Sequence, residues 1–484
     1  MPALTKETRA ELLDLLKLNA GQAESGERPG LEIFPIAEHI RALEPQVVLV
    51  VGDRGSGKTQ LKNALTDVKL RKALARQATS VRAPDGEAEW LTGWPLSQGP
   101  DQITWREFAR RHQGSRENLV RVWLAYFVRS LVDRLDVASS LHELRELPLI
   151  EAERFLATCK DHGQEFVALI DALDAHLQER NRWLVIAYDE LDTVVLDDWE
   201  ALGTIIRGLV TMWASYARRW QRVRPKIFLR TDFYRHHREI AGADVAKLAA
   251  NRVELSWSDK NLYGALIKHI VNKDEELRSH LGSTLDLSRD AALGWIPRLA
   301  SANDARKFIH RLVGEFMGAD RKKGDAFKWI LDHLRDGNKR ALPRTLVWLI
   351  EFAAERERAD MRATGARLLH HVSLRNALDR VSDQYVQQTE TNEFVWLPGL
   401  RRRLERDREV PWSRKELERL LNHEFAGSWS TSGDVRPPGI DPSEVLENLI
   451  ELGLVRARPD GLVDVPDLYL SGLGLKRKGG VARE

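Results

Sequence analysis

The sequence Gln46–Leu65, QVVLVVGDRGSGKTQLKNAL, decides the fold of this chain. Its first part is an apolar, mostly β-branched run that stops at a glycine, which is typical of a buried strand. Residues 52–59, GDRGSGKT, then match G-x-x-x-x-G-K-[ST] at every fixed position. Leu61, Ala64 and Leu65 follow at helical spacing. The order of strand, glycine loop and helix predicts a cradle for phosphate groups.

Each residue type in this loop has a physical part in holding a nucleotide. Glycines let the backbone turn tightly, so that amide N–H groups approach a phosphate, and the start of the helix adds partial positive charge. Lys58 is expected to reach the β- and γ-phosphates, and the Thr59 hydroxyl is expected to ligate Mg²⁺. The predicted cofactors are ATP and Mg²⁺, since the sequence lacks an N-K-x-D guanine motif. The predicted cofactor-binding residues are Gly52, Asp53, Arg54, Gly55, Ser56, Gly57, Lys58, Thr59 and Gln60.

Composition limits the class of protein. The chain has 484 residues, enough for roughly two to four domains, and 30% of them are charged. A net charge of +2 gives no overall basic field that would favour nucleic acid. Cys159 is the only cysteine, so no disulfide can form within the chain. Without a signal sequence or an apolar run near about 18 residues, we expect a cytoplasmic protein with no membrane contact.

A second stretch supplies carboxylates. Residues 183–190, WLVIAYDE, form an apolar strand that ends in Asp189 and Glu190. Asp189 is expected to hold Mg²⁺, and Glu190 is expected to polarise the attacking water. The adjacent glutamate indicates the branch of ATPases that carries its own catalytic base, with an extra strand between the two nucleotide motifs.

Between the two nucleotide motifs lies a helical insertion at about 77–181. We expect a strand at 79–82, helices over 119–135 and 166–177, and a Gly/Pro-rich loop that holds Trp90, Trp94 and Trp105. Packing is the favoured role for these tryptophans. After the acidic strand we expect a helix over 197–223, a strand over 226–230 and a last strand entered by residues 250–255.

The sequence after residue 258 predicts a helical lid and a small C-terminal domain. Helices are expected at 261–271, 291–299, 304–316, 326–334, 345–354 and 366–381. Beyond them, a capping box at Ser413–Glu416, a helix capped at Asp441 and an Asp-Gly hairpin suggest a winged helix. Its second helix, 441–452, carries four acids and no lysine or arginine, which favours protein contact over DNA. The basic residues Lys476, Arg477 and Lys478 keep the DNA alternative open.

The predicted fold class is therefore α/β. A parallel-sheet P-loop NTPase core is joined to a helical lid and a C-terminal winged-helix-like domain. The expected division is an N-terminal helical arm over 1–45, the ATPase core over 46–258, the lid over 259–400 and the winged-helix-like domain over 405–484.

The whole pattern resembles bacterial P-loop ATPases of the ASCE class and the AAA+/STAND type. The residues that carry this resemblance are GDRGSGKT (52–59), YDELD (188–192), FLRTDFY (228–234), KLAANRVELSW (247–257) and LPRTLVWLIEFA (342–353). It is strongest with ATPases found beside genes for defence against phages, whose ending looks similar to VPDLYLSGLGLKRKG (465–479). A second resemblance is to replication-initiator AAA+ proteins, which join such strands to a lid and a winged helix.

Four further catalytic candidates are expected. Arg230 and Thr231 stand at the tip of the 226–230 strand, where a polar residue can sense the γ-phosphate. The resemblance implies that Arg252, just before the last strand, is an arginine finger for a neighbouring subunit. It also implies that Arg344, in a proline–arginine pair at a helix start, is a second sensor that reports the γ-phosphate to the lid.

Three functions are compatible with these residues. The first is a slow ATPase that uses ATP to switch conformation or to form a homo-oligomer, acting with a separate effector protein in anti-phage defence. The second is a DNA-binding initiator or loader. The third is a scaffold that binds nucleotide only for structural reasons, against which the intact Glu190 argues.

Overall fold

The computed structural model describes residues 3–18, 29–77, 87–94, 102–132, 144, 151–195, 198–231, 233–234, 251–392, 394–405, 407–422, 437, 439 and 441–479. The chain divides into two compact units. We call Pro35–Ser256 the core unit, and Met1–Phe34 together with Trp257–Glu484 the helical unit. The finer division into four parts stays a prediction, and the strand expected at 79–82 lies outside the described residues.

The core unit is built on a five-stranded sheet with the order β2-β3-β4-β1-β5. Every neighbouring pair of strands is parallel. Strand β4 lies between β1, which leads into the phosphate loop, and β3, which leads into Asp189, and this confirms the predicted extra strand. The strands are β1 (Leu49–Gly52), β2 (Glu87–Trp94), β3 (Arg182–Tyr188), β4 (Val223–Arg230) and β5 (Val253–Glu254).

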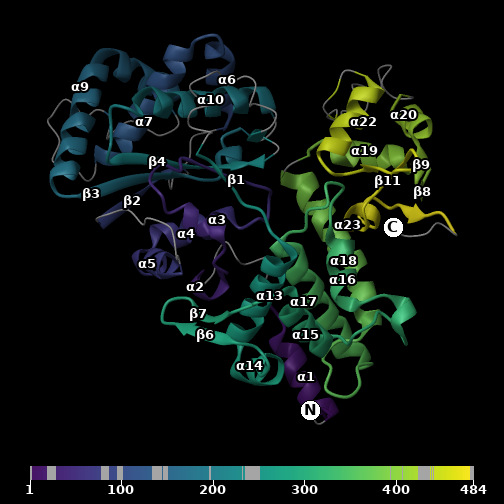
Figure 1. Ribbon diagram of the computed structural model, residues 1–484. Coiled ribbons are helices and arrows are strands. Elements are labelled where there is room, and N and C mark those ends of the chain that lie inside the picture. The colour runs from purple at the N-terminus through teal and green to yellow at the C-terminus, as the bar shows by residue number, and fades with distance from the viewer. Residues whose placement is uncertain are drawn as a thin grey trace. The chain divides into compact units, whose positions relative to one another are not determined.

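Helices cover both faces of this sheet, as Figure 1 shows. Among the described residues, the longer helices of this unit lie on one face and the shorter ones on the other. The long ones are α6 (Gln102–His112), α7 (Arg116–Val132), α9 (Ala152–Glu179) and α10 (Trp199–Tyr216). The shorter ones are α3 (Ala37–Arg41), α4 (Lys58–Thr66) and α5 (Val68–Arg76). Because a parallel sheet is buried on both faces, its strands read as continuous apolar runs.

The insertion packs its aromatic residues into the core of this unit. Trp94 and Trp105 are 2% and 0% exposed, which confirms the packing role. The predicted loop for the tryptophans is wrong, since Trp90 and Trp94 lie on β2 and Trp105 lies on α6. The reason is tertiary: β2 pairs with β3 along its whole length, so its tryptophans face a buried sheet. Trp94 and Trp105 meet edge to face, with ring centroids 6.2 Å apart.

Helix α9 fixes the start of β4 through a buried carboxylate. Asp174, which is 6% exposed, accepts hydrogen bonds from the backbone amides of Gln221 (2.9 Å), Arg222 (2.7 Å) and Val223 (2.8 Å). These bonds satisfy amides that a continued helix would otherwise use. They explain why α10 ends at Tyr216 and not at Val223 as predicted. Helix α9 itself runs well beyond the predicted 166–177, mostly at its N-terminal end.

We expect Asp174→Asn to lower the free energy of unfolding by about 2 kcal/mol, because the amide side chain has one acceptor oxygen for three backbone donors. Urea unfolding of the full chain measures this loss. Asp161→Asn is the matched control, since Asp161 is exposed on the same helix. If the two variants unfold at the same urea concentration, Asp174 does not anchor β4.

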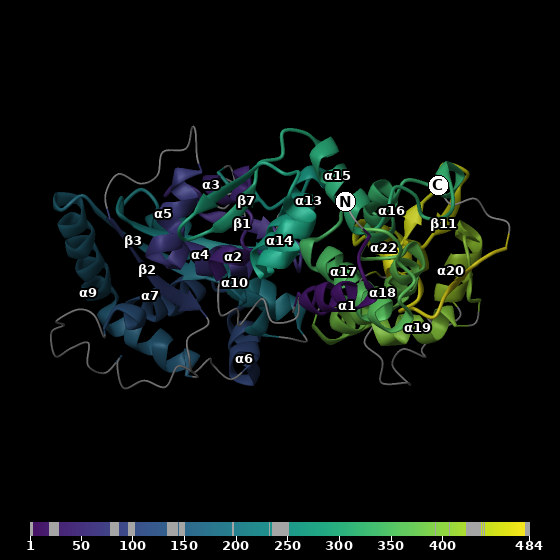
Figure 2. The ribbon, with the colours of Figure 1, turned by 90° about the horizontal axis from the view of Figure 1, so that it is seen from below.

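The helical unit gathers most of the remaining helices around one apolar core. In Figures 1 and 2, α1 (Lys6–Leu15) lies beside α17 (Pro343–Asp360), with which it makes direct contact. No helix among the described residues combines the length and apolar composition needed to cross a bilayer. The other helices are α2 (Pro29–Glu32), α13 (Asp259–Lys273), α14 (Glu275–Gly282), α15 (Ala302–Leu312), α16 (Ala326–Leu334), α18 (His371–Asn392) and α19 (Leu397–Leu404).

One predicted lid helix is a β-hairpin. Residues 291–299 were expected to be helical, but β6 (Leu287–Asp290) and β7 (Gly294–Pro297) pair antiparallel there. The Asp290 carboxylate accepts from the amides of Ala292 (2.8 Å) and Leu293 (3.1 Å) and so forms the turn. Gly294 has a φ of +70°, which favours glycine. These turn contacts outweigh the apolar spacing that suggested a helix.

A second buried carboxylate explains why α18 begins later than the sequence predicted. Glu357 of α17 is 0% exposed. It accepts from the amides of Ala363 (2.6 Å) and His370 (3.1 Å) and from the Ser373 hydroxyl (2.6 Å). The segment before α18 is thereby held as a loop, so the helix begins at His371 and not at Ala366 as predicted.

Acid is expected to destabilise the helical unit through His269 on α13, whose Nε2 donates to the Leu18 carbonyl (3.1 Å). Burial, with repulsion from Lys273 and Lys268, lowers the pKa of His269 from 6.5 to about 4. Between these two values the unfolded chain binds more protons than the folded chain, so stability falls as pH falls. We expect a loss of about 2–3 kcal/mol between pH 7 and pH 4.5.

Urea unfolding of wild type and His269→Gln at pH 7 and pH 4.5 checks this loss. The wild type should lose more stability than the variant over this interval. An equal loss in the two proteins would exclude His269 as the source.

The C-terminal part of the helical unit has the predicted winged-helix-like order. A helix, α20 (Arg414–Asn422), is followed by α22 (Pro442–Glu451) and a hairpin of β10 (Arg456–Ala457) and β11 (Leu462–Asp464). Strand β9 (Trp412–Ser413) pairs with β11 and completes a three-stranded sheet. Both predicted caps are present, since Ser413 and Glu416 bond reciprocally and Asp441 caps α22. The short elements of this end are β8 (Glu409–Val410), α23 (Asp467–Leu470) and β12 (Lys476–Arg477).

The chain thus has a P-loop NTPase core, helices beyond it and a winged-helix-like end.

Candidate functional site

The phosphate loop connects β1 to α4 at the carboxyl edge of the sheet. Gly55 and Gly57 have φ values of +80° and +94°, which L side chains rarely adopt. Gly52 is confined too, since a Cβ there would lie 2.4 Å from the Ser56 Oγ. Gly55 and Gly57 are therefore required by backbone shape, and Gly52 by the lack of space beside Ser56. The loop ends at the first turn of α4, whose amides have no acceptor within the helix.

Lys58 closes this loop in the structure. Its Nζ donates to the backbone carbonyls of Gly52 (2.8 Å) and Asp53 (3.0 Å). The ammonium group is therefore held over the loop by neutral acceptors. Phosphate oxygens are stronger acceptors for a charged donor, so a bound triphosphate would compete for this lysine.

Asp189 lies at the end of β3, where its amide donates to the Trp94 carbonyl (3.0 Å). The residue is 2% exposed, and its Oδ2 is buried without a hydrogen-bond partner in the described part of the chain. Burial raises the pKa of Asp189, against hydrogen bonds from the Glu190 backbone and the Thr59 side chain and the charges of Lys58 and Lys62. The structure thus brings Thr59 and Asp189 together, as the sequence predicted.

These two residues fit a magnesium ion. A buried carboxylate oxygen without a donor, beside a hydroxyl, is an oxygen pair of the kind Mg²⁺ prefers. Over the described ranges, no group of three or more His, Cys, Asp or Glu side chains could hold a metal by itself. Mg²⁺ is usually held by one or two protein oxygens together with substrate phosphates, so a pair is sufficient.

Glu190 follows directly and is exposed. Its backbone is left-handed, with φ +53° and ψ +31°, which is uncommon for a residue other than glycine. The next residues form a 3₁₀ turn, η3 (Leu191–Thr193). The structure places the predicted base beside Asp189, and its conformation was not foreseen from the sequence.

Arg230 and Thr231 reach the same edge of the sheet. Arg230 is the last residue of β4 and is in register with Gly52 of the phosphate loop. It is 8% exposed, and its Nη1 lies 3.6 Å from the Asp192 Oδ2. Thr231 is 4% exposed. Their sensing roles stay predictions, but their position beside the loop agrees with them.

Arg252 lies elsewhere in the core unit. It precedes β5, and its guanidinium stands 5.4 Å from the centre of the Tyr234 ring. It also lines a cavity of about 450 Å³, together with Ala37, Glu38, Arg41, Val253 and Glu254. Residues 235–250, which include the start of KLAANRVELSW, lie outside the described residues. The finger role of Arg252 stays a prediction.

Arg344 belongs to the helical unit. Pro343 occupies the first turn of α17, as predicted, and Arg344 Nη1 lies 3.5 Å from the Gln388 Oε1 of α18. Its role as a second sensor stays a prediction.

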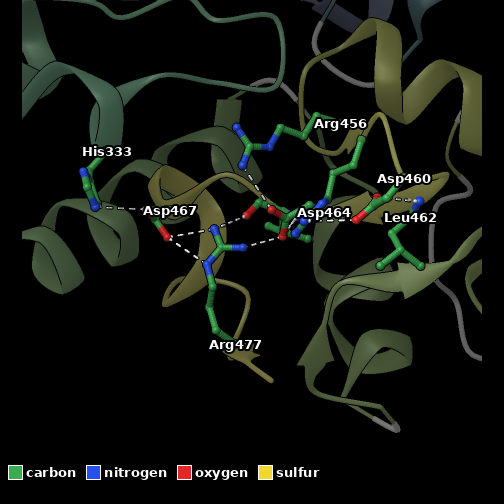
Figure 3. Close-up of polar contacts among 9 residues, drawn as sticks. His333, Arg456, Asp460, Leu462, Asp464, Asp467 and Arg477 are labelled. Atoms are coloured by element: carbon green, nitrogen blue, oxygen red, sulfur yellow. Dashed lines mark hydrogen bonds and ion pairs between the residues drawn. The ribbon is translucent and has the colours of Figure 1, made fainter. Parts of the chain in front are cut away.

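Part of the basic tail proposed for DNA contact is engaged within the helical unit, and Figure 3 shows the contacts of Arg477. Arg477 Nη1 donates to Asp464 (2.5 Å) and its Nη2 donates to Asp467 (2.9 Å). Arg456 donates to the same Asp464, which is 1% exposed (3.1 Å). Lys478 Nζ donates to the Pro411 carbonyl (2.9 Å). Two of the three basic residues of the tail are thus used internally, which weakens the case for phosphate contact.

Sequence reasoning missed Asp192, Thr193 and Lys62. Asp192 is the last residue of YDELD, whereas Thr193 and Lys62 lie just beyond the recognised motifs. The contacts of all three depend on tertiary placement. The fifth position of YDELD is the only local signal for Asp192, and Lys62 lies one helical turn after Lys58.

No family model matches the chain, and no curated protein matches it. A search of solved structures returned the ORC1 protein of Aeropyrum pernix in complex with DNA, at 15% identity and TM-score 0.35, covering 98% of this chain and 92% of that one. It also returned the ORC2 protein of the same organism with ADPNP and ADP, at 13% identity and TM-score 0.28, covering 96% and 94%. The Walker-type ATPase of Pyrococcus abyssi matches at 15% identity and TM-score 0.35, covering 91% and 95%.

Likenesses of this size carry no argument about function. The class of protein rests on this chain's own sheet order, phosphate loop and acidic strand end, which together define a P-loop NTPase fold.

Proposed function

We propose that this protein binds ATP with Mg²⁺ and hydrolyses it slowly. The observation that supports this most is the buried Asp189 Oδ2, which has no hydrogen-bond partner in the described residues and stands next to Thr59 at the phosphate loop. A buried anionic group in such a place is costly unless a cation accompanies it. A magnesium–triphosphate unit supplies that cation.

The residues then have separate roles in the reaction. Lys58 exchanges its bonds to the loop carbonyls for bonds to phosphate oxygens. Thr59 and Asp189 hold Mg²⁺, which neutralises charge on the phosphates when it is bound. Glu190 accepts the proton of the attacking water, and Arg230 stands close enough to the loop to respond to the terminal phosphate.

We further propose that nucleotide binding acts as a switch for conformation or for homo-oligomer assembly with an effector protein. The contact between Arg230 and the turn after Glu190 supports a switch, because a terminal phosphate competes with Asp192 for the same guanidinium. Assembly rests on the expected role of Arg252. A part in anti-phage defence stays a prediction from the resemblance alone.

The test is phosphate release by the wild-type chain with ATP or GTP, in Mg²⁺ or in EDTA, together with its size with and without ATP. Release with ATP that EDTA abolishes supports the proposal. No release and no ATP binding at millimolar concentration contradict it. Release with an unchanged size at micromolar protein leaves hydrolysis in place and rejects assembly.

DNA binding is the second candidate, favoured by the winged-helix-like order of α20, α22 and the hairpin. Against it, Asp441, Glu444, Glu447 and Glu451 are all exposed on or beside α22. Measuring the affinity for DNA over a series of salt concentrations tests this candidate, because contacts to phosphates make that affinity fall steeply as salt rises. Absence of binding at low salt removes this candidate.

A further inference from the structure

The turn that carries Glu190 is held in an unusual backbone shape. The left-handed conformation at φ +53° costs a residue with a Cβ roughly 1–2 kcal/mol, so it persists only where surrounding contacts enforce it. Such a conformation also fixes the direction of the Cα–Cβ bond. The position of the Glu190 carboxylate therefore depends on whatever holds the Glu190 backbone.

Thr193 supplies two of these contacts. Its amide donates to the Glu190 carbonyl (2.9 Å), and its Oγ1 donates to the same oxygen (2.8 Å). Thr193 is exposed and takes no part in the apolar core. Its hydroxyl bonds to a backbone carbonyl of the turn, and the exposed side chain lies outside the apolar core, so it can be changed without disturbing the packing.

The turn is fixed at two further points. On one side the Asp189 amide donates to the Trp94 carbonyl of β2 (3.0 Å). On the other side Asp192 pairs with Arg230 of β4 at 3.6 Å. The segment from Asp189 to Thr193 is therefore bonded to both strands that flank β3. Within the segment, Thr193 bonds to the Glu190 carbonyl.

We propose that Thr193 is a positioning residue, whose hydroxyl holds the Glu190 carboxylate where it accepts the proton of the attacking water. This inference rests on the proposed ATP hydrolysis and names a residue that the nucleotide motifs do not include. The proposed action of Thr193 runs through Glu190, whose carbonyl oxygen it holds. Loss of its hydroxyl lets the Glu190 backbone relax toward the ordinary α or β regions and moves the carboxylate.

The experiment compares Thr193→Val with Thr193→Ser in the full chain. Valine has the shape of threonine without the hydroxyl, and serine keeps the hydroxyl. We expect Thr193→Val to lower kcat for ATP about three- to ten-fold, the range of one net hydrogen bond, with KM within about two-fold of wild type. Thr193→Ser should restore the wild-type kcat to within about two-fold.

The same two substitutions are then made in a Glu190→Gln chain. If Thr193 acts through Glu190, Thr193→Val has no further effect there, because the carboxylate that it positions is gone. An equal loss of kcat in both backgrounds overturns the proposal, since Thr193 would then act by another route. Equal kcat for the valine and serine variants overturns it too.

These results separate the inference from the function on which it rests. If Glu190→Gln lowers kcat and Thr193→Val does not, hydrolysis stands and the positioning role is wrong. If the wild-type chain releases no phosphate, both are wrong. A change in KM with unchanged kcat assigns Thr193 to nucleotide binding and likewise overturns its positioning role.

Discussion

Replacing Lys58 with methionine is expected to weaken ATP binding by about 100- to 1,000-fold. The ammonium group lies at the phosphate loop, held by the Gly52 and Asp53 carbonyls at 2.8 and 3.0 Å. Two unit charges 4 Å apart interact by about 4 kcal/mol at an effective dielectric constant of about 20, which corresponds to roughly 1,000-fold in affinity. The lost bonds to the two carbonyls lower this figure, because wild type must break them before it binds phosphate.

Calorimetric titration with ATP and Mg²⁺ measures this loss. Lys69→Met is the matched control, because Lys69 is an exposed lysine of the neighbouring helix α5 and should bind ATP like wild type. If Lys58→Met binds ATP within about three-fold of wild type, the loop does not hold the triphosphate. The roles of Thr59, Asp189 and Glu190 would then lose their basis.

Glu190→Gln is expected to separate hydrolysis from binding. A positioned general base contributes about 100- to 10,000-fold to a rate, and glutamine keeps the size of the side chain but cannot take the proton. We therefore expect kcat to fall at least 100-fold while the Kd for ATP stays within about three-fold. The exposed position of Glu190 argues that the fold tolerates this change.

Single-turnover phosphate release and ATP titration of the same variant check both halves of this expectation. Glu179→Gln is the control, since Glu179 is exposed at the end of α9, away from the phosphate loop. A Glu190→Gln chain that hydrolyses ATP at the wild-type rate would show that another group activates water. A chain that no longer binds ATP would show that Glu190 has a structural part in the site.

The two substitutions act on different steps, so together they distinguish a switch from a scaffold. In a nucleotide-driven switch, Lys58→Met mimics the empty state, whereas Glu190→Gln stays in the ATP state. If size in solution depends on nucleotide, Lys58→Met should have the size of the nucleotide-free wild type. Glu190→Gln should have the size of the ATP-bound wild type. A scaffold that needs nucleotide only for structure would respond to Lys58→Met alone.

Local motifs made the core of the site predictable. Residues 52–59 and Asp189–Glu190 need no tertiary information, because the chemistry lies in contiguous residues at the ends of apolar strands. The caps at Ser413 and Asp441 were predictable for the same reason. The inserted strand β4 followed from the adjacent glutamate, which indicates the branch of ATPases with that sheet order.

Other features depended on partners distant in the sequence. The helix expected at 291–299 is a hairpin because Asp290 and Gly294 form a turn that its apolar spacing does not reveal. Trp90 and Trp94 lie on a strand because β3 pairs with it. Helix α10 ends early because Asp174, on α9, captures the amides that begin β4. In each case a contact made after folding outweighed local preference.

The sequence by itself determined that this chain folds around a phosphate loop and an acidic strand end, because these motifs bring their own backbone shape and charge. Only the tertiary structure decided which charges serve the site and which serve the fold. Arg477 is held by Asp464 and Asp467, and Arg230 at the end of β4 is paired with Asp192 in the turn after β3. An ion pair needs its partners within a few ångströms of each other, and that distance is set by strand pairing and packing, not by spacing along the chain.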